Sequence, residues 1–412
     1  MSDLFDVEIS LALKDFIKAS CSILQEYDRK GEHPRYVTKE KVVLHEKGMS
    51  IEDVQIPSYV SLIFKVRDKL ENLDEINRVV EKRLQNTVFP RPSLLRDNGK
   101  PLTDDDYVYS LKWGSIQFLF RYLDENRGVA FNESLFDKLY KEYEYYEVTK
   151  IVKFNVICPL FNFEMNTDEF KIEENYIIRK ITNEEFQQIY LDDVFDSRPP
   201  FIMIHAVRFV ISTTYESDEP ETIKDKIIEK IDTIITTLRL YGEGDLNHGV
   251  IRQIPISWTS GYNPLIGNKR SVIWRGRTYV LNIEEFGSFS AFYSKFKESK
   301  NIKRLQIALS RFNFSYDRNR DEDKIIDLIV GFESLIVEEK ERPWDRGAYV
   351  GTACSMLIGK TYDERKDIKK FLQDAFNIRN RIVHGSNYDK KKLKKIIPDL
   401  ESLLRKSLIL LL

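Results

Sequence analysis

Residues 379–385, with the sequence RNRIVHG, combine two arginines, an asparagine and a histidine within two helical turns near the C-terminus. The chain has only five histidines, and imidazole is the one side chain whose unperturbed pKa lies near neutrality. Arginine is the preferred fork for phosphate oxygens because its planar guanidinium matches their geometry. These groups could therefore bind a phosphodiester and move its protons.

Spacing along a helix decides which of these side chains can meet. Asn380 and His384 are four residues apart and share one helix face, and Arg381 and His384 are three apart. Arg379 precedes His384 by five residues, about 140° around a regular helix, so the two side chains do not simply stack. They can converge if His384 lies in a frayed last turn, or if a second copy of the chain supplies one of them. The alternative is a helix end whose cations complement the helix dipole.

Length and composition bound the class of protein. At 412 residues the chain is long enough for two or three domains, and 42% hydrophobic with 32% charged residues is typical of a soluble globular protein. Three widely spaced cysteines indicate a reducing compartment and argue against a disulfide framework or a zinc site. The N-terminus does not resemble a signal peptide, and no apolar run reaches about eighteen residues. We therefore expect a cytoplasmic protein with no membrane segment, metal or cofactor.

Charge is unevenly distributed along the chain. The net charge is -2, whereas residues 360–412 hold 14 Lys and Arg against 7 Asp and Glu, a local charge of +7. The remaining residues therefore sum to -2 - 7 = -9. A basic end on an acidic body is expected if only that end meets nucleic acid. The alternative is a lysine-rich, solvated helix face.

Three regions differ in their residue patterns. Residues 1–149 have apolar side chains at helical spacing and are predicted to be mainly helical. Residues 150–300 contain alternating, β-branched segments and one long helix, which predicts an α+β region that could sense or regulate. Residues 301–412 are predicted to form a four-helix up-and-down bundle, with helices over 323–339, 348–358, 368–383 and 393–408. The predicted fold class is therefore α+β and mostly helical.

A few isolated residues were considered as further functional candidates. His248, beside a glycine, is predicted to lie in a loop, with a structural role favoured over a chemical one. Trp258 and Trp274 are the best candidates for exposed aromatic rings that could stack on bases. Most other aromatic residues follow helix and strand patterns and are expected to pack in the core.

A resemblance to a known family rests on two segments. Arg379 and His384 form an Arg-x4-His signature, with Asn380 directly after the arginine, in the third helix of the predicted bundle. The first helix carries DLIVGFESLI over residues 327–336, in which Glu333 is the second acidic residue. Together with the glycine that ends the third helix, these features resemble the HEPN superfamily, in particular its ApeA-like branch. The motif match covers about residues 315–412.

The resemblance implies a helical bundle that dimerises, with two Arg-x4-His segments lining one cleft. Many members of the superfamily are metal-independent ribonucleases of toxin–antitoxin and antiphage systems, and others bind RNA or nucleotides without cleaving them. By position, Arg379 and His384 match the signature, Asn380 its usual polar neighbour and Glu333 the acidic residue of the first helix. The implied partners are RNA, a second copy of the chain, and a regulatory protein or phage-derived trigger.

We therefore predict an endoribonuclease in which His384 acts as base on a ribose 2′-OH or as acid on the leaving oxygen. Arg379 would neutralise charge on the phosphorane, and Asn380 and Glu333 would orient the catalytic pair. The RNA backbone would be held by Arg381 and by five lysines, namely Lys390, Lys391, Lys392, Lys394 and Lys395. Two alternatives stay open: a non-catalytic HEPN module that binds RNA, a nucleotide or protein, and a dimerisation bundle whose chain functions through residues 1–300.

Overall fold

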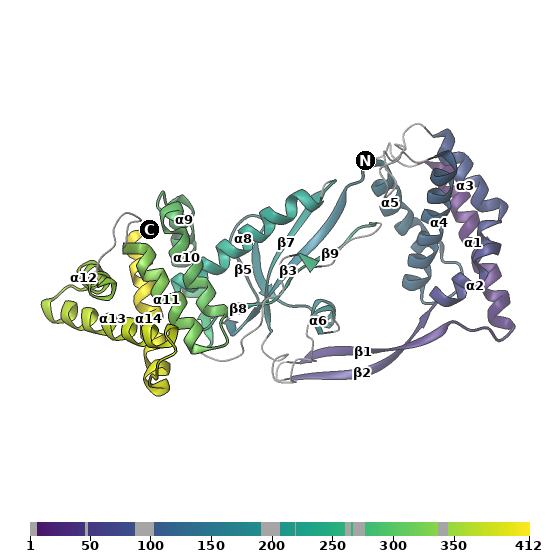
Figure 1. Cartoon of the computed structure of the whole chain (residues 1–412). Coiled ribbons are helices and arrows are strands. Elements are labelled where there is room, and N and C mark those ends of the chain that lie inside the picture. The colour runs from purple at the N-terminus through teal and green to yellow at the C-terminus, as the bar shows by residue number, and fades with distance from the viewer. Residues whose placement is uncertain are drawn as a thin grey trace.

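The molecule is elongated, with N-terminal helices at one end, an antiparallel sheet in the middle and C-terminal helices at the other end (Figure 1). The computed structural model describes residues 6–45, 48–86, 103–190, 207–218, 220–259, 265–266, 277–336 and 345–412. Helices predominate, and the larger sheet is built from antiparallel strand pairs. The predicted class, α+β and mostly helical, is confirmed.

Five helices build the core of the N-terminal region: α1 (Val7–Arg29), α2 (Val60–Glu71), α3 (Asp74–Gln85), α4 (Asp104–Asn126) and α5 (Glu133–Thr149). A capping box between Thr103 and Asp106 begins α4, so the first backbone N–H groups of that helix are satisfied. Trp258, from the middle region, enters this core with 4% of its surface exposed and lies 5.5 Å from the Phe118 ring. The expectation that Trp258 is exposed is therefore wrong, and Trp274 lies outside the described residues.

A long β-ribbon interrupts the helices of residues 1–149, and the helical prediction missed it. Strands β1 (Arg35–His45) and β2 (Gly48–Ser58) pair antiparallel, with Arg35 opposite Ser58. Both strands are rich in β-branched residues, with Val37, Thr38, Val42 and Val43 in β1 and Ile51, Val54 and Ile56 in β2, and such residues favour strand over helix. An isolated two-stranded ribbon is only marginally stable, and here β1 also contacts α6 (Asn183–Tyr190) of the middle region (Figure 1). The ribbon thus joins the first region to the second.

The middle region is organised around a seven-stranded sheet in the order β10-β9-β3-β7-β6-β5, with β8 also paired to β3. Its members are β3 (Val152–Phe161), β5 (Glu169–Lys171), β6 (Ile177–Lys180), β7 (Phe209–Ser217), β8 (Asn247–His248), β9 (Ile251–Pro255) and β10 (Leu265–Ile266). A parallel pair, β4 (Phe163–Met165) and β11 (Tyr279–Leu281), lies beside it. The central strand β3 pairs with β7 on one side and β9 on the other.

Different helices cover the two faces of this sheet. Successive side chains of a strand point to opposite faces, so Cys158 and Leu160 of β3 pack with α8 (Pro220–Tyr241). Ile157 and Phe161 face the other side and pack with α6 (Asn183–Tyr190). His248 lies in the short strand β8 with 2% of its surface exposed, so the predicted loop position is wrong.

A closed polar network fixes α6 on the sheet. Arg179 of β6 donates to both carboxylate oxygens of Glu185 at 2.8 and 2.6 Å. Glu185 also accepts from the Thr182 backbone N–H and from Asn155 of β3. Ser212 of β7 closes the ring, since its hydroxyl accepts from Arg179 and donates to Asn155. Each carboxylate oxygen of Glu185 is thereby paired in the interior, as buried charges require.

In the described part of the C-terminal region five helices pack together: α10 (Ile302–Asp317), α11 (Asp321–Ile336), α12 (Arg346–Ile358), α13 (Tyr362–Val383) and α14 (Lys390–Leu411). The four predicted helices correspond to α11 to α14, and the prediction missed α10, which packs against α11 and α14. Glycines let α12 approach α13 closely, because a Cβ at Gly351 would lie 3.1 Å from the Lys369 carbonyl oxygen. One apolar core joins all five helices.

The sheet region and the C-terminal helices share a junction at the end of α8. Leu240 belongs to the apolar core of the bundle, as does Phe296 of α9 (Phe286–Glu298), which follows the short 3-10 helix η1 (Ile283–Glu285). The Arg239 guanidinium, also buried, stacks 4.4 Å from the Tyr316 ring centroid. Arg405 of α14 donates its Nε–H to the Arg239 carbonyl at 2.8 Å. None of the described helices is long and apolar enough to cross a membrane.

Candidate functional site

The end of α13 is shaped by local sequence signals. A capping box between Thr361 and Glu364 begins the helix, and its last residue is Val383. Gly385 follows with φ +67°, a left-handed conformation that glycine adopts without strain. The N–H groups of Gly385 and Ser386 then donate to the carbonyls of Ile382 and Arg381, which closes a Schellman motif. The left-handed turn therefore explains why position 385 is a glycine. This residue fixes where the chain leaves the helix.

Arg379 is held by an ion pair across the bundle. Its Nη2 donates to both carboxylate oxygens of Glu333 on α11, each at 3.0 Å. Its Nη1 donates to Oδ1 of Asn380 at 3.1 Å. Nε is buried and has no hydrogen-bond partner within the described residues. The structure thus brings three of the predicted residues, Arg379, Asn380 and Glu333, into one hydrogen-bonded group.

His384 lies at the C-cap of α13 and is exposed to solvent. Its backbone N–H donates to the Asn380 carbonyl at 3.0 Å, which extends the helical pattern by one residue. Among the described residues no hydrogen bond involves its imidazole, so His384 and Arg379 are not joined within one chain. Arg381 is likewise exposed. The imidazole is therefore accessible to a ligand, but the side chains of the predicted catalytic pair, Arg379 and His384, are not hydrogen-bonded to each other within one chain.

Basic side chains begin the next helix, a short loop away. Asp389 caps α14 by accepting from the N–H groups of Lys391 and Lys392. Three consecutive lysines in a first helical turn oppose the helix dipole, so they are unfavourable for the helix itself. Lys392 offsets this by an ion pair with Asp374 of α13 at 3.0 Å. The other lysines of the predicted set have no ion pair within the described residues: Lys390, Lys391, Lys394 and Lys395.

Tyr388 is a site residue that the sequence reasoning missed. It lies in the loop between α13 and α14, and its hydroxyl donates to the Glu322 carboxylate in the first turn of α11. This hydrogen bond lowers the pKa of Glu322 and raises that of Tyr388. Helix α11 therefore holds Arg379 through Glu333 and the loop after His384 through Glu322. The sequence signal was weak, since one tyrosine in a six-residue polar loop does not reveal its distant partner.

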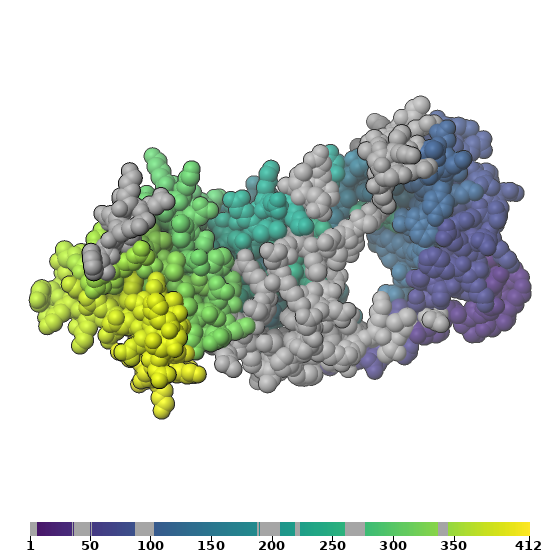
Figure 2. Space-filling view, viewed as in Figure 1, coloured from purple at the N-terminus to yellow at the C-terminus, as the bar shows by residue number. Residues whose placement is uncertain are grey.

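The arginines, His384 and the lysines thus gather at one end of the bundle, where α13 ends and α14 begins. In Figure 2 the yellow atoms of the C-terminal segment lie on the visible surface at one end of the molecule. Such an arrangement can attract an anionic backbone, hold a phosphate at a guanidinium and present an imidazole for proton transfer. Among the described residues no group of three or more His, Cys, Asp or Glu side chains is arranged to hold a metal ion.

Comparisons with family models, with curated proteins and with solved structures find no match to this chain.

Proposed function

We propose that this protein is a metal-independent endoribonuclease of the HEPN type, with Arg379 and His384 as its catalytic residues. The observation that supports this most is the ion pair with Glu333, which fixes the Arg379 guanidinium in the segment that also carries an exposed histidine. The nearby unpaired lysines supply an electrostatic attraction for the RNA backbone. Such a role also fits the basic charge of residues 360–412.

In the proposed reaction His384 accepts the proton of a ribose 2′-hydroxyl, and the 2′-oxygen attacks the adjacent phosphorus. The bond from phosphorus to the 5′-oxygen breaks, and that oxygen takes a proton from a general acid. The products are a 2′,3′-cyclic phosphate and a 5′-hydroxyl end. Arg379 stabilises the charge that develops on the phosphorane oxygens, an effect commonly worth about 3 kcal/mol. Glu333 and Asn380 orient the guanidinium, which agrees with their hydrogen bonds to it.

The proposal includes a dimer, because one chain leaves the catalytic pair apart. A spacing of five residues turns Arg379 away from His384, and no hydrogen bond joins their side chains in the described structure. A second copy packed against the same end of the bundle would bring its own Arg379 and His384 to the cleft. One imidazole could then act as the base and the other as the acid. A strictly monomeric protein in solution would contradict this arrangement.

Cleavage of labelled RNA in the presence of EDTA tests the proposal. We expect His384→Ala and Arg379→Ala each to lower the cleavage rate at least about a hundredfold, as the loss of a catalytic acid–base or oxyanion group does. Circular dichroism should show both variants folded, since His384 is exposed and Arg379 lies at a helix surface. His33→Ala is the matched control, because this exposed histidine lies in the distant N-terminal region. Wild-type cleavage by both site variants would refute the proposal.

A second candidate function is RNA or nucleotide binding without cleavage. The separation of His384 from Arg379 within one chain favours it, because binding needs only the cations and not their convergence. Salt-sensitive RNA binding without new 5′-hydroxyl ends, at any protein concentration, would support this function instead. If the site variants bind RNA like the wild type, the function lies in residues 1–300 and the bundle acts only in dimerisation.

A further inference from the structure

Helix α13 carries a stripe of amide side chains that leads to His384. Four polar residues follow one another at spacings of four, three and four, so their side chains fall within about 60° around the helix axis: Gln373, Asn377, Asn380 and His384. Gln373 is partly exposed and the other three are exposed, whereas the opposite side of the helix holds buried residues such as Ala375. The stripe therefore faces solvent, at the end of the molecule opposite the N-terminal helices (Figure 1).

Two of these amides have no structural role within the described residues. The side chains of Gln373 and Asn377 make no hydrogen bond there, whereas Asn380 accepts from Arg379. Asparagine is a weak helix former, because its side chain competes with the helix for backbone hydrogen bonds. Asn377 lies inside α13 and therefore weakens the helix without making a stabilising contact. The donors and the acceptor of both amides are available to a ligand.

The charges along the stripe suit a polyanion. Lys366 and Lys370 continue it toward the start of α13, and both are exposed and have no ion pair within the described residues. A solvated helix face usually alternates cations with carboxylates. Here Asp367 and Asp374 lie about 100° or more around the axis from the first amide, so they fall outside the stripe. From Lys366 to His384 the stripe extends about 27 Å without a carboxylate, and a nucleic acid strand can lie along it.

Amide side chains are suited to recognise nucleobases, and adenine above all. An asparagine or glutamine offers a carbonyl acceptor beside an NH2 donor. Adenine presents the complementary pair, the N6 amino group as donor and N7 as acceptor, so two hydrogen bonds form together. In single-stranded RNA the bases are unstacked and their edges are open to such contacts. Lysines alone bind phosphates without regard to sequence, so the amides add base recognition to the stripe.

We propose that Gln373 and Asn377 read the bases of a single-stranded RNA that lies along α13, with a preference for adenine. Lys366 and Lys370 bind the backbone of this strand, and His384 meets the scissile phosphate where the stripe ends. The two amides are specificity residues, because they lie one turn or more before the residues that act on the phosphate. This inference rests on the proposed ribonuclease function and adds to it the class of substrate.

Three labelled RNA strands test the proposal with the full-length protein. Each strand is a run of uridines about 12 nucleotides long, and its two central positions are adenine, cytosine or uridine. Fluorescence anisotropy gives the affinity for each strand, and gel analysis in the presence of EDTA gives the cleavage rate and the cleavage position. We expect the wild-type protein to bind and cleave the adenine strand at least about tenfold better than the other two.

Variants at the two amides separate base recognition from a structural role. Asn377→Asp keeps the shape of the side chain but replaces its donor with an acceptor, so the preference for adenine should be lost and cytosine, which donates from N4, should be favoured. Gln373→Ala should reduce the preference for adenine to below about threefold, while cleavage of the uridine strand stays within about twofold of wild type. Gln306→Ala is the matched control, since this exposed amide lies on α10.

The outcomes distinguish this inference from the function on which it rests. If the wild-type protein cleaves all three strands alike, or if both variants keep its preference for adenine, the inference fails and the proposed function stands. If adenine is preferred in binding and the variants lose that preference, but no strand is cleaved, the base contacts are supported and the catalytic function fails. If the protein neither binds nor cleaves any strand, both fail.

Discussion

Two arginine–glutamate ion pairs in this protein have similar geometry but lie in different surroundings. In the middle region Arg179 and Glu185 are joined at 2.6 Å, and their side chains are 19% and 9% exposed. At the end of the bundle Arg379 and Glu333 are joined at 3.0 Å, with side chains 20% and 16% exposed. By distance and exposure the pairs are alike. They differ in what surrounds them.

The pair of the middle region is complete. Glu185 accepts four hydrogen bonds, from both terminal nitrogens of Arg179, from Asn155 and from the Thr182 N–H. The pair at the bundle end leaves Arg379 Nε without a partner in the described structure, beside an exposed asparagine and near an exposed histidine. A network in which every polar group is hydrogen-bonded helps to specify a fold. A network with an unpaired polar group can still bind a ligand through that group. The difference supports a structural role for the first pair and agrees with the binding role proposed for the second.

The largest effect should follow from breaking the closed pair. Arg179→Ala leaves Glu185 charged and largely buried without its main partner, which we expect to cost about 3 kcal/mol in the free energy of unfolding. Urea unfolding followed by circular dichroism measures this loss. A loss below about 1 kcal/mol would mean that α6 does not depend on the network.

At the other pair the change is Glu333→Ala, which removes the carboxylate and leaves the Arg379 guanidinium in place. Because Glu333 accepts hydrogen bonds only from Arg379 within the described residues, fewer bonds are lost, and we expect a stability loss of only about 1 kcal/mol. If the proposed function holds, RNA cleavage should nevertheless fall about tenfold, since the Arg379 guanidinium loses the group that orients it. Arg179→Ala should therefore mainly lower stability, whereas Glu333→Ala should mainly lower activity. Equal stability losses in both would remove the distinction between the pairs.

The stabilising contribution of Glu185 should depend on pH in a different way from that of another buried glutamate, Glu401. Burial raises the pKa of Glu185, but the bonds from Arg179, Thr182 and Asn155 outweigh it and the pKa is lowered. Its stabilising contribution is therefore present above pH 4.5, its ordinary pKa, and is lost as pH falls through the lowered value. For Glu401 burial dominates and the pKa is raised, so its contribution is present at low pH and is lost as pH rises through that value.

Two isosteric variants measure this contrast. The stability difference between wild type and Glu185→Gln should shrink on acidification below pH 4.5. The difference between wild type and Glu401→Gln should instead stay constant below pH 4.5 and change as pH rises from 4.5 through the raised pKa of Glu401. Urea unfolding at a series of pH values gives both curves. Parallel curves would show that the two carboxylates share one environment.

Local sequence signals predicted much of this molecule. The glycine at 385 was correctly predicted to end α13, because a glycine stop signal acts within a few residues. A role for Glu333 in orienting the catalytic pair was expected only through the family resemblance, and its ion pair with Arg379 was not predicted, since the two residues lie 46 positions apart. Spacing on the helix correctly indicated that Arg379 and His384 do not stack within one chain.

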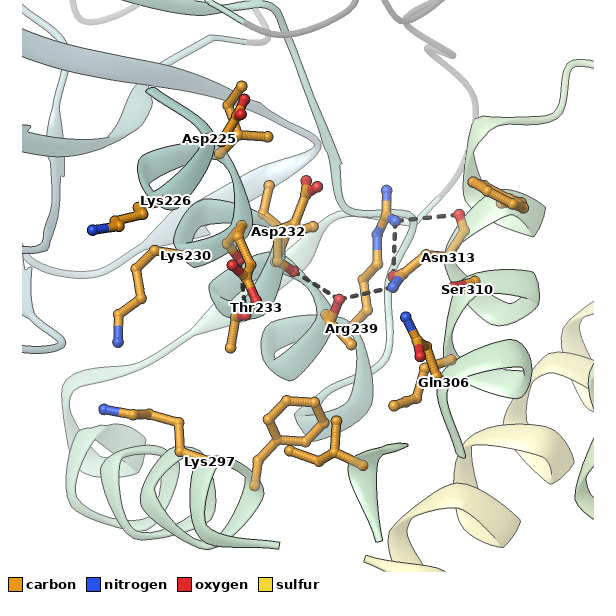
Figure 3. A pocket seen from close by; sticks show the side chains of 18 residues that line it. Asp225, Lys226, Lys230, Asp232, Thr233, Arg239, Lys297, Gln306, Ser310 and Asn313 are labelled. Carbon is orange, nitrogen blue, oxygen red and sulfur yellow. Dashed lines mark hydrogen bonds between the residues drawn. The ribbon is translucent and has the colours of Figure 1, made fainter. Parts of the chain in front are cut away.

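Other features depended on distant parts of the chain and were missed. The strand pattern of the ribbon was overlooked among neighbouring helices, and its contact with α6 connects two regions. Trp258 follows a strand of the middle region, yet its ring is buried among N-terminal aromatics such as Phe118 and Tyr143. Helix α10 was not separated from its surroundings, although it lines one side of the pocket between α8, α9 and α10 (Figure 3). In each case the surroundings of the segment are formed by residues far away in the sequence, so the local sequence pattern does not predict them.

A smaller effect should distinguish the lysines that begin α14. Lys394→Ala combined with Lys395→Ala removes two cations without ion pairs in the described structure, so RNA affinity should fall and its dependence on log salt should lose about 1.5 in slope. Lys392→Ala should change the slope less, because its ammonium already binds Asp374. Lys406→Ala, near the other end of the same helix, is a matched control. Equal slopes for all variants would place the RNA elsewhere.

The smallest effect should come from Tyr388→Phe, which removes one hydroxyl from the open end of the bundle. The lost bond to Glu322 is solvated, so the cost in global stability should be at most about 1 kcal/mol. Its consequence should be local: backbone amides of the loop between His384 and Asp389 should exchange hydrogen faster, while those of α6 stay unchanged. Hydrogen exchange measured by mass spectrometry tests this without assuming any activity. Unchanged exchange in the loop would show that the Schellman turn at Gly385 alone fixes the position of His384, and that α11 positions only the arginine.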